Sequence, residues 1–357
     1  MDLPLPELDP ELPPGVPPPR LTPPVWPLWI ASLYLLVVVL VALVSRTLAE
    51  TRWWSTLLIY LPQVLYFTPA PFVLLPVLWS RDRRTLGVFI ATLLLIAGPI
   101  MGARVPLPNF APGQAPRVRV LAYNIQGGKA GFDLLQAQVE RYQPDVVVFS
   151  EARDWGDERP LQAYLAKQFP NWAATVGGDV YIASRWPFAE TEALPLSDFR
   201  TRDPSLDREK VRALVDAPFG RFQVVGVHLY TAIYGRTLRK EWKHVPTYMR
   251  HTGSVRKDQV RDLLEWTGKM DEPLILAGDF NTPPAGQIYQ KLTHSFGDAF
   301  AERGLGWGYT FQTDRPLLRI DYIFHSRQWE VIRCEVGTMP GSDHRPVFAE
   351  LARRKQR

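Results

Sequence analysis

The sequence predicts a layered α/β sandwich with mixed or antiparallel sheets, preceded by about three transmembrane helices. Two observations indicate this fold class. Residues 26–103 contain three long uncharged runs, and nearly all ionisable residues follow Ala103. Residues 117–357 contain many short apolar segments of strand length, few helical segments, and tight turns between some of the strands. Tight turns join antiparallel strands, so the pattern argues against a doubly wound parallel sheet.

The charge of the chain resides in its C-terminal part. The formal net charge is +5, and the six Lys or Arg and six Asp or Glu that precede Ala103 cancel. A mildly basic domain suits an anionic substrate or a phosphate-bearing surface without requiring one. Cys334 is the only cysteine, which excludes an intrachain disulfide and a zinc site made of thiolates. We also expect no disulfide-linked partner.

The first 25 residues are dense in proline and carry scattered acids. Such a composition cannot bury a core, so we predict a disordered or polyproline-like tail. The acids stand where a secretory signal would carry positive charge. We therefore expect no cleaved signal peptide.

Three uncharged runs follow the tail, at residues 26–45, 53–80 and 85–103. The hydrocarbon core of a bilayer is about 30 Å thick and needs roughly 20 apolar residues in a helix, so each run is a candidate span. The second run is interrupted by four prolines and fits either a kinked span or a re-entrant segment. Buried core helices of a soluble domain are the alternative, which three such runs in series disfavour.

The arginines between the runs predict an orientation. Arg81, Arg83 and Arg84 crowd the break between the second and third runs, and the positive-inside tendency assigns that break to the cytoplasm. Arginines in the first break and after the third run favour the opposite orientation. We expect an integral protein of the plasma (inner) membrane whose C-terminal domain is extracytoplasmic.

A linker rich in proline and glycine, residues 104–116, leads to a domain at residues 117–357. Apolar periodicity predicts helices at 132–142 and 255–269, and a strand that ends at Asp279. Further strands are predicted at 118–124, 145–151, 180–184, 211–217, 222–229, 318–324, 329–336 and 347–351.

The end of the strand at Asp279 is the most informative stretch of the chain. Asp279 and Asn281 lie two residues apart on extended backbone, so their side chains share a face, and Gly278 lets the backbone approach a ligand closely. An acid in this place is otherwise a turn former or a helix cap. The other predicted strand ends decide between these interpretations.

Polar residues recur at the ends of the predicted strands, namely Asn124, Glu151, His228, Asp279 with Asn281, Asp321, and Asp343 with His344. Burying an isolated carboxylate costs on the order of several kcal/mol of folding free energy, because the ion loses its hydration, unless the carboxylate is paired or binds a metal. Each residue has an ordinary alternative, namely a turn cap for Asn124, an ion pair with Arg153 for Glu151, a core histidine for His228, a cross-strand partner for Asp321 and an Asx-turn at Asp343. Their recurrence at successive strand ends favours one shared site.

With these motifs the chain resembles the endonuclease/exonuclease/phosphatase family over residues 117–357. The matching motifs, in the family's order, are Leu121-Ala122-Tyr123-Asn124, Val148-Phe149-Ser150-Glu151, Ile182-Ala183-Ser184-Arg185, Val227-His228-Leu229, Gly278-Asp279-Phe280-Asn281, Arg319-Ile320-Asp321-Tyr322-Ile323 and Ser342-Asp343-His344-Arg345-Pro346-Val347. A histidine at position 228 is similar to the deoxyribonuclease and sphingomyelinase branches. The resemblance implies a four-layered α/β sandwich, two mixed sheets flanked by helices, and hydrolysis of a phosphoester with a divalent metal.

The resemblance also implies roles for the strand-end residues. Glu151 is the expected ligand of Mg²⁺ or Mn²⁺, with Asn124 and Asp343 close to the ion, which agrees with the preference of these ions for oxygen ligands. The metal polarises a phosphoryl oxygen and stabilises the leaving oxygen. His344 is expected to accept a proton from the attacking water or to orient it, and Asp321 to set its tautomer.

Two roles then remain for residues beside the metal. Asp279 is expected to align the attacking water, and whether Asp279 or His344 takes its proton is left open. Asn281 and His228 are expected to hold the non-bridging oxygens where charge develops.

The substrate is expected to bear a phosphate that is either lipid-linked or part of a nucleic acid. Residues 230–251 form a basic stretch with interleaved aromatics, a pattern that suits a nucleic-acid backbone, an anionic membrane surface or merely a solvated face. A domain tethered to a membrane favours a lipid-linked phosphate or pyrophosphate. A nuclease acting on nucleic acid is the alternative, and a non-catalytic binding module with the same fold is a third hypothesis.

Overall fold

The computed structural model describes residues 24–106, 115–153, 161–197, 208–232, 242–338 and 341–354. The predicted tail lies outside these residues except for its last two positions, as do residues 107–114 of the predicted linker. Residues 233–241 of the basic stretch also lie outside them.

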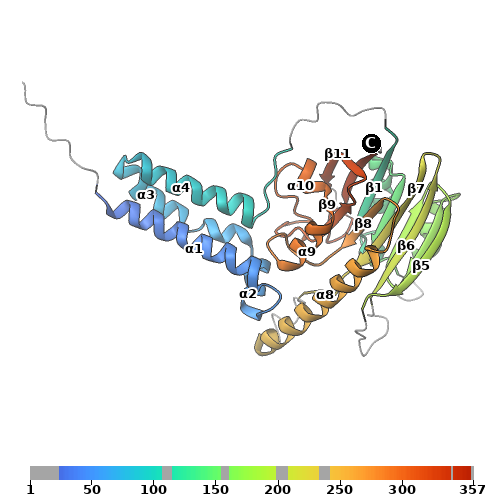
Figure 1. The fold of residues 1–357 in the computed structure, drawn as a ribbon, viewed down its shortest axis with the longest axis horizontal. Coiled ribbons are helices and arrows are strands. Elements are labelled where there is room, and N and C mark those ends of the chain that lie inside the picture. The colour runs from blue at the N-terminus through green and yellow to red at the C-terminus, as the bar shows by residue number, and fades with distance from the viewer. Residues whose placement is uncertain are drawn as a thin grey trace, which may run out of the picture.

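Apolar helices form an elongated bundle at one end of the molecule (Figure 1). The helical stretches long and apolar enough to cross a membrane are Trp26–Leu48, Gln63–Ser80 and Arg83–Ile100 among the described residues. The elements that make them up are α1 (Trp26–Leu48), the 3₁₀ turn η1 (Gln63–Phe67), α3 (Ala70–Ser80), α4 (Arg83–Leu95) and the π-helical η2 (Ile96–Ile100). Asp82 separates the last two stretches by capping α4, accepting hydrogen bonds from the backbone of Arg84 and Thr85.

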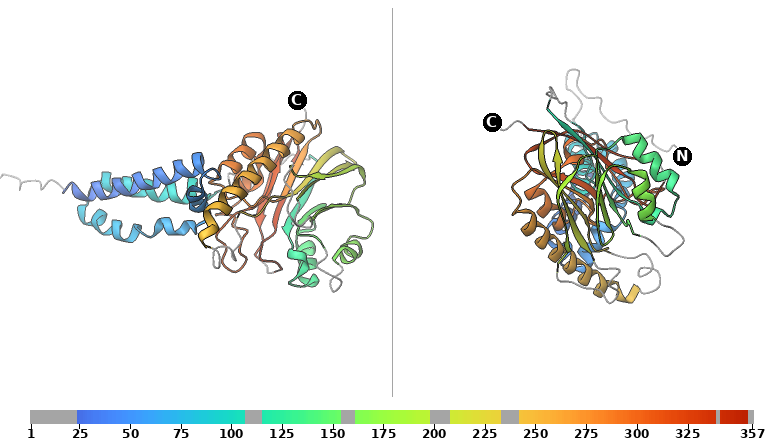
Figure 2. Two further views of the ribbon diagram at one scale, coloured as in Figure 1. Left: turned by 90° about the horizontal axis from the view of Figure 1, so that it is seen from below. Right: turned by 90° about the vertical axis from the view of Figure 1, so that its right-hand side faces the viewer.

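The second uncharged run differs from the expectation, because only its C-terminal part is a candidate span. Its first part forms α2 (Trp53–Tyr60), which ends before Pro62 and lies against α8 (Val245–Thr267) of the C-terminal domain. Proline cannot continue the hydrogen-bond ladder of a helix, so the run breaks there into two helices. Figure 2 shows α2 at the junction between the bundle and the sheets.

The first sheet has six strands in the order β11-β12-β1-β2-β4-β3. Only β1 and β2 are parallel among its described pairs, and α5 (Phe132–Tyr142) connects them. The strands are β1 (Arg117–Asn124), β2 (Val146–Ser150), β3 (Ala173–Gly177), β4 (Val180–Ser184), β11 (Trp329–Val336) and β12 (Val347–Arg353).

The second sheet repeats this plan with the order β5-β6-β7-β8-β10-β9. Here β7 and β8 are the parallel pair, and α8 connects them. The strands are β5 (Phe188–Pro195), β6 (Glu209–Ala217), β7 (Gly220–His228), β8 (Leu274–Asp279), β9 (Gly297–Asp298) and β10 (Asp321–His325).

The two sheets pack face to face around an apolar core that both supply, with members such as Val120, Val148, Val224 and Ile275. The outer face of the first sheet packs against α5 and α6 (Leu161–Gln168), and that of the second against α8 and α9 (Gln287–Ser295). The layers therefore run helix, sheet, sheet, helix. This confirms the expected four-layered α/β sandwich with two mixed sheets.

Most predicted elements are present, and the differences have local causes. The helix predicted at 255–269 begins ten residues earlier, at Val245, because the basic stretch that precedes it is itself helical from there. The strand predicted at 318–324 begins only at Asp321. Elements that the sequence did not predict are α6, α9, α10 (Ala299–Arg303), β3, β5, β9 and the 3₁₀ turns η3 (Gln126–Gly128) and η5 (Trp242–His244).

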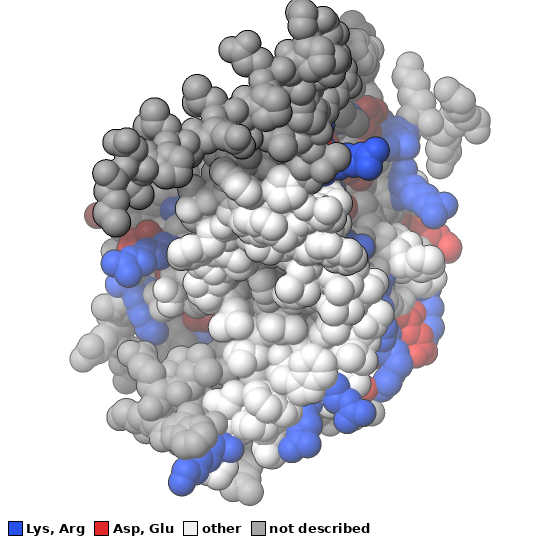
Figure 3. Space-filling view, turned by 90° about the vertical axis from the view of Figure 1, so that its left-hand side faces the viewer, with Lys and Arg blue, Asp and Glu red and all other residues white. Residues whose placement is uncertain are grey.

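Seen from the end that carries the helical bundle, the molecule presents an uncharged centre, and Lys and Arg lie around its edge (Figure 3). Large apolar side chains of the bundle point outward, including Trp29, Leu33, Phe72 and Leu75. An aqueous surface rarely carries so large an apolar patch, which suits helices that face lipid.

Candidate active site

Three neighbouring strands of the second sheet bring three predicted site residues side by side. Asp279 is the last residue of β8, and it pairs with His228 of β7 on one side and with Asp321 of β10 on the other. All three are buried. The register of the sheet therefore makes Asp279 the centre of a row of ionisable side chains.

The first sheet adds the ends of its own parallel pair. Asn124 ends β1, and its Nδ2 donates hydrogen bonds to Glu151 Oε1 at 3.2 Å and to Asp279 Oδ2 at 3.1 Å. Glu151 directly follows β2 and has a left-handed backbone with φ 53°. The hydroxyl of Ser150 accepts a hydrogen bond from the backbone N–H of Asp279 at 3.3 Å. These contacts join the carboxyl ends of the two parallel pairs across the sandwich.

His344 forms a hydrogen-bonded pair with Asp321, with 2.8 Å between Nδ1 and Oδ2. This pairing directs the other ring nitrogen of His344, Nε2, toward the pocket, where it lies 3.8 Å from Asp279 Oδ2. Burial alone would lower the pKa of His344, but the carboxylates of Asp321 and Asp279 outweigh burial and raise this pKa to about 10. The imidazole is therefore held as a cation that can donate from Nε2.

Asp279 is surrounded by donors although it is buried. Burial and the neighbouring Asp321 carboxylate raise its pKa, while His344 and His228 act in the opposite direction. Its Oδ1 accepts a hydrogen bond from the backbone N–H of Asn281 at 2.8 Å, and His228 Nε2 lies 3.6 Å from its Oδ2. Asp279 thus has a stronger affinity for a proton than an exposed aspartate.

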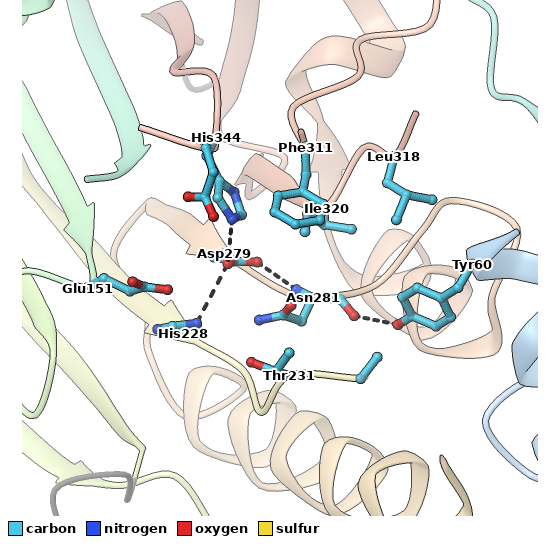
Figure 4. A pocket seen from close by; sticks show the side chains of 12 residues that line it. Tyr60, Glu151, His228, Thr231, Asp279, Asn281, Phe311, Leu318, Ile320 and His344 are labelled. Carbon is cyan, nitrogen blue, oxygen red and sulfur yellow. Dashed lines mark hydrogen bonds and ion pairs between the residues drawn. The ribbon is translucent and has the colours of Figure 1, made fainter. Parts of the chain in front are cut away.

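These side chains surround a pocket with a volume of about 250 Å³. Glu151, His228, Asp279 and His344 point toward one another on one side of it, and Figure 4 shows apolar side chains on the other. Of the predicted site residues, Glu151, His228, Asp279, Asn281, Asp343 and His344 line the pocket. Asn124 and Asp321 lie directly behind it, in contact with lining residues. The structure therefore brings all eight predicted residues together.

The chemistry of this pocket fits a divalent cation. Four carboxylates, those of Glu151, Asp279, Asp321 and Asp343, gather around it, and Asp321 Oδ1 is buried without a hydrogen-bond partner among the described residues. So many carboxylates in a buried place repel one another unless a cation or a proton intervenes.

Two sets of side chains offer ligand atoms for such a cation. Asp279, Asp321 and His344 form a described group whose ligand atoms lie within 4.8 Å of one another. In this group His344 Nδ1 and Asp321 Oδ2 already bind each other, which leaves His344 Nε2 and Asp321 Oδ1, the latter without a hydrogen-bond partner among the described residues, for a metal. Glu151, which is partly exposed to the pocket, keeps its carboxylate available beside Asn124 and Asp343. This second set does not involve the hydrogen-bonded pair of His344 and Asp321.

Two further residues at the site were not predicted from the sequence. Asp179 lies between β3 and β4, and its Oδ2 contacts His228 Nδ1 at 2.8 Å and Arg208 at 2.6 Å. Asp179 could have been found from the sequence, because it follows Gly178 and directly precedes a predicted strand. An acid at a strand boundary is the pattern that marked the other candidate residues. The second residue is Tyr60 of α2, which lines the pocket from a segment predicted to cross the membrane. No local pattern marked it.

A family model described as the endonuclease/exonuclease/phosphatase family matches residues 121–344, which include all the residues of the pocket except Tyr60. The chain belongs to the endonuclease/exonuclease/phosphatase family. The members of this family are phosphoester hydrolases.

Solved structures show the same fold. An endonuclease/exonuclease/phosphatase from Beutenbergia cavernae DSM 12333 matches with a TM-score of 0.51 and 22% identity, covering 66% of this chain and 72% of its own. A family protein from Bacteroides thetaiotaomicron matches with a TM-score of 0.53 and 17% identity over 68% of this chain and 100% of its own. The mannosyl-6-phosphatase of Bacteroides thetaiotaomicron VPI-5482 gives a TM-score of 0.52 and 17% identity, covering 66% and 99%.

At these identities the likeness concerns the fold alone. No curated protein matches the sequence significantly.

Proposed function

We propose that this family member is a membrane-anchored phosphoester hydrolase that depends on Mg²⁺ or Mn²⁺ and acts on a lipid-linked phosphate or pyrophosphate. The observation that carries the proposal is the convergence of Glu151, Asp279 and His344 on one pocket. These residues come from separate strands and loops. Because the members of the family are phosphoester hydrolases, their convergence supports a role in phosphoester hydrolysis.

In this proposal Glu151, with Asp343 and Asn124 beside it, holds the divalent cation. The cation would supply charge stabilisation for the phosphoryl group and the leaving oxygen. The carboxylate oxygens of Glu151 and Asp343 are of the type that Mg²⁺ and Mn²⁺ prefer, while the Asn124 amide oxygen accepts a hydrogen bond from the backbone N–H of Gln126. Asn124 contacts both Glu151 and Asp279, so it links the metal side of the pocket to the reacting side.

The roles of the remaining residues follow from their hydrogen bonds. His344, kept cationic by Asp321, donates from Nε2 to a phosphoryl oxygen. Asp279 aligns the attacking water and, because burial raises its pKa, is the better proton acceptor of the two. His228 and Asn281 hold the other non-bridging oxygens. His228 is kept in place by Asp179, which binds its Nδ1.

A lipid-linked substrate is supported by the surroundings of the pocket. The apolar helices end next to the pocket, and Tyr60 from their side reaches into it. Phe311, Leu318 and Ile320 make one side of the pocket apolar, which suits a hydrocarbon chain beside a phosphate. The alternative substrate is nucleic acid, for which the exposed Lys243, in η5 just before α8, is suitably charged.

The test measures phosphate release or strand cleavage by the full-length protein in detergent with Mg²⁺. The panel is plasmid DNA, phosphatidic acid and a polyprenyl pyrophosphate. We expect hydrolysis of a lipid substrate that EDTA abolishes and that added Mg²⁺ or Mn²⁺ restores. Cleavage of plasmid DNA alone would establish the nuclease instead, and no hydrolysis of any substrate would leave a non-catalytic binding module.

The site assignment is tested with Glu151→Gln and His344→Ala. Each should lower kcat by about 10² to 10⁴, the range that one acid–base or metal-binding group contributes. Glu140→Gln and His294→Ala are matched controls, because both residues are exposed on helices away from the pocket. Full activity in both site variants would rule out the assignment.

A further inference from the structure

The turn between α1 and α2 is built into the surface of the C-terminal domain. Glu50, in this turn, is buried, and its Oε2 accepts a hydrogen bond from the backbone N–H of Gln287 at 2.9 Å. Gly253 and Gly286 leave room for the turn, since a Cβ at Gly253 would lie 2.7 Å from the Glu50 carbonyl oxygen. A contact that needs two glycines and buries a carboxylate is a specific interface between the helical bundle and the domain.

This interface places Tyr60 at the active site. The Tyr60 hydroxyl donates to the backbone carbonyl oxygen of Asn281 at 2.5 Å, and Arg256 Nη1 donates to the same oxygen at 2.7 Å. Arg256 also hydrogen bonds to the Tyr60 hydroxyl and to Thr282 Oγ1. Burial raises the pKa of Tyr60, so the hydroxyl keeps its proton and remains a donor. Both lone pairs of the Asn281 carbonyl are thus occupied.

The backbone carbonyl that Tyr60 and Arg256 bind is that of Asn281, whose side chain holds a non-bridging oxygen in the proposed function. Asn281 has a left-handed backbone with φ 46°, a conformation that asparagine adopts more readily than most other L residues. Its side chain lines the pocket while its Nδ2 donates to the Leu229 carbonyl at 3.0 Å. Holding the Asn281 carbonyl therefore fixes the direction of the amide that faces the substrate.

The ring of Tyr60 has a second effect, because it completes the apolar side of the pocket. Figure 4 shows Tyr60 beyond Asn281, on the side of Leu318 and Ile320 and away from Glu151. A phosphate bound between Glu151 and His344 would then leave its organic group directed toward these apolar side chains. The pocket is polar at one end and apolar at the other.

We propose that the membrane-anchoring segment completes the catalytic pocket through Tyr60, which positions Asn281 and selects phosphoesters that carry an apolar chain. This inference rests on the proposed function and assigns to it a positioning residue outside the matched family region. Tyr60 acts on the reaction through Asn281 and on binding through its ring. The two effects are separable, because one depends on the hydroxyl and the other on the aromatic ring.

The test compares two diesters with the same leaving group, methyl p-nitrophenyl phosphate and octyl p-nitrophenyl phosphate, using full-length protein in nanodiscs with Mg²⁺. Tyr60→Phe should lower kcat on both diesters about tenfold and leave KM unchanged, because one hydrogen bond to Asn281 is lost and the ring remains. Tyr60→Ala should in addition raise KM about tenfold for the octyl diester alone, because the apolar contact is lost.

Tyr34→Phe is the matched control. Its hydroxyl donates to the Tyr66 carbonyl at 2.5 Å within the helical bundle, so the same atom is removed without touching the pocket. We expect wild-type kinetics from it on both diesters.

The outcomes distinguish between failure of the positioning role, failure of the selection and failure of the proposed function. A Tyr60→Phe protein with wild-type kcat overturns the positioning role, and a Tyr60→Ala protein with an unchanged ratio of octyl to methyl KM overturns the selection. If Tyr60→Ala does not fold, Tyr60→Gln, which replaces the ring by a polar side chain of intermediate size, takes its place in the KM comparison. A wild-type protein that hydrolyses neither the diesters nor the lipid substrates named above counts against the proposed function itself, and the inference falls with it.

Discussion

At the scale of single residues, the site depends on how Asp279 is surrounded. Asn124 and the two histidines, His228 and His344, approach its Oδ2, and the Asn281 backbone binds its Oδ1. Each of these partners comes from a different segment of the chain. A carboxylate that is 1% exposed is tolerated here because partial positive charges face it from several sides.

Asp179 shows the same principle one step further from the pocket. It is 1% exposed and contacts both Arg208 and His228. Burial works against its ionisation, but His228 and Arg208 prevail and lower its pKa to about 2. The pair holds the imidazole of His228 in one orientation, with Nε2 directed toward Asp279.

This arrangement predicts a pH dependence of stability. The folded-state pKa of Asp179 lies below its usual value of 3.8, so its ion pairs stabilise the protein above that pH and are lost as the pH falls toward 2. From pH 5 to pH 2, the free energy of unfolding should fall by about 2 kcal/mol more in the wild type than in Asp179→Asn. Thermal unfolding of both proteins across this range measures the difference, and equal slopes would show that Asp179 is not ionised as the contacts indicate.

At the scale of elements, the parallel strand pairs explain why the site forms where it does. In each sheet one helix connects the parallel pair, β1 to β2 through α5 and β7 to β8 through α8. Parallel neighbours have their carboxyl ends at the same edge, so Asn124, Glu151, His228 and Asp279 reach that edge together. The face-to-face packing of the sheets then brings the two edges into contact.

The contact between the α1–α2 turn and α8 gives a prediction at this scale. Gly253→Ala should lower the free energy of unfolding by about 1 to 3 kcal/mol, because its Cβ would meet the backbone of Glu50, which cannot rotate away. Thermal unfolding in detergent, followed by tryptophan fluorescence, measures the loss. Gly87→Ala in α4 is the matched control, since a Cβ there meets nothing within 4 Å and alanine favours a helix. Equal stability of Gly253→Ala and the wild type would contradict the packing of the turn.

At the scale of the whole molecule, the helical bundle has two distinct ends. Trp26 at the start of α1 lies 5.6 Å from Trp79 near the end of α3, ring centre to ring centre. The N-terminal end of α1 and the Arg81–Arg84 break therefore lie together at the end far from the sheets (Figure 1). The other end of the bundle carries α2 and joins the domain, and Arg104 pairs there with Gly306. If the three helical stretches cross a membrane, the arginine-rich break and the domain lie on opposite sides of it.

This arrangement predicts the orientation in the plasma (inner) membrane. The arginines of the far break favour the cytoplasm, so the domain should be extracytoplasmic. A reporter enzyme that is active only outside the cytoplasm, fused after Arg357, should be active, and a fluorescent protein that folds only in the cytoplasm should be dark at the same position. The reverse result would place the domain in the cytoplasm and contradict the predicted orientation.

Much of the molecule was predictable from local sequence patterns. The strands β4 and β11 and the helix α5 have the predicted bounds, because alternation and helical spacing depend only on near neighbours. Short or amphipathic elements such as α6, β3 and β5 were not predicted, since their patterns are weak over so few residues. The prolines of the second uncharged run predicted a kinked or re-entrant segment, but not that the run divides before Pro62 into α2 and a candidate span.

By itself, the sequence determined the fold class and the candidate residues of the pocket. Apolar runs and strand-end polar residues are properties of short segments, and the candidate site of this chain lies at its strand ends. Only the tertiary structure decided which side chains hold the pocket in place. The pairing of Asp179 with His228 spans 49 residues and that of Tyr60 with Asn281 spans 221, and no local pattern encodes contacts made by packing segments so far apart.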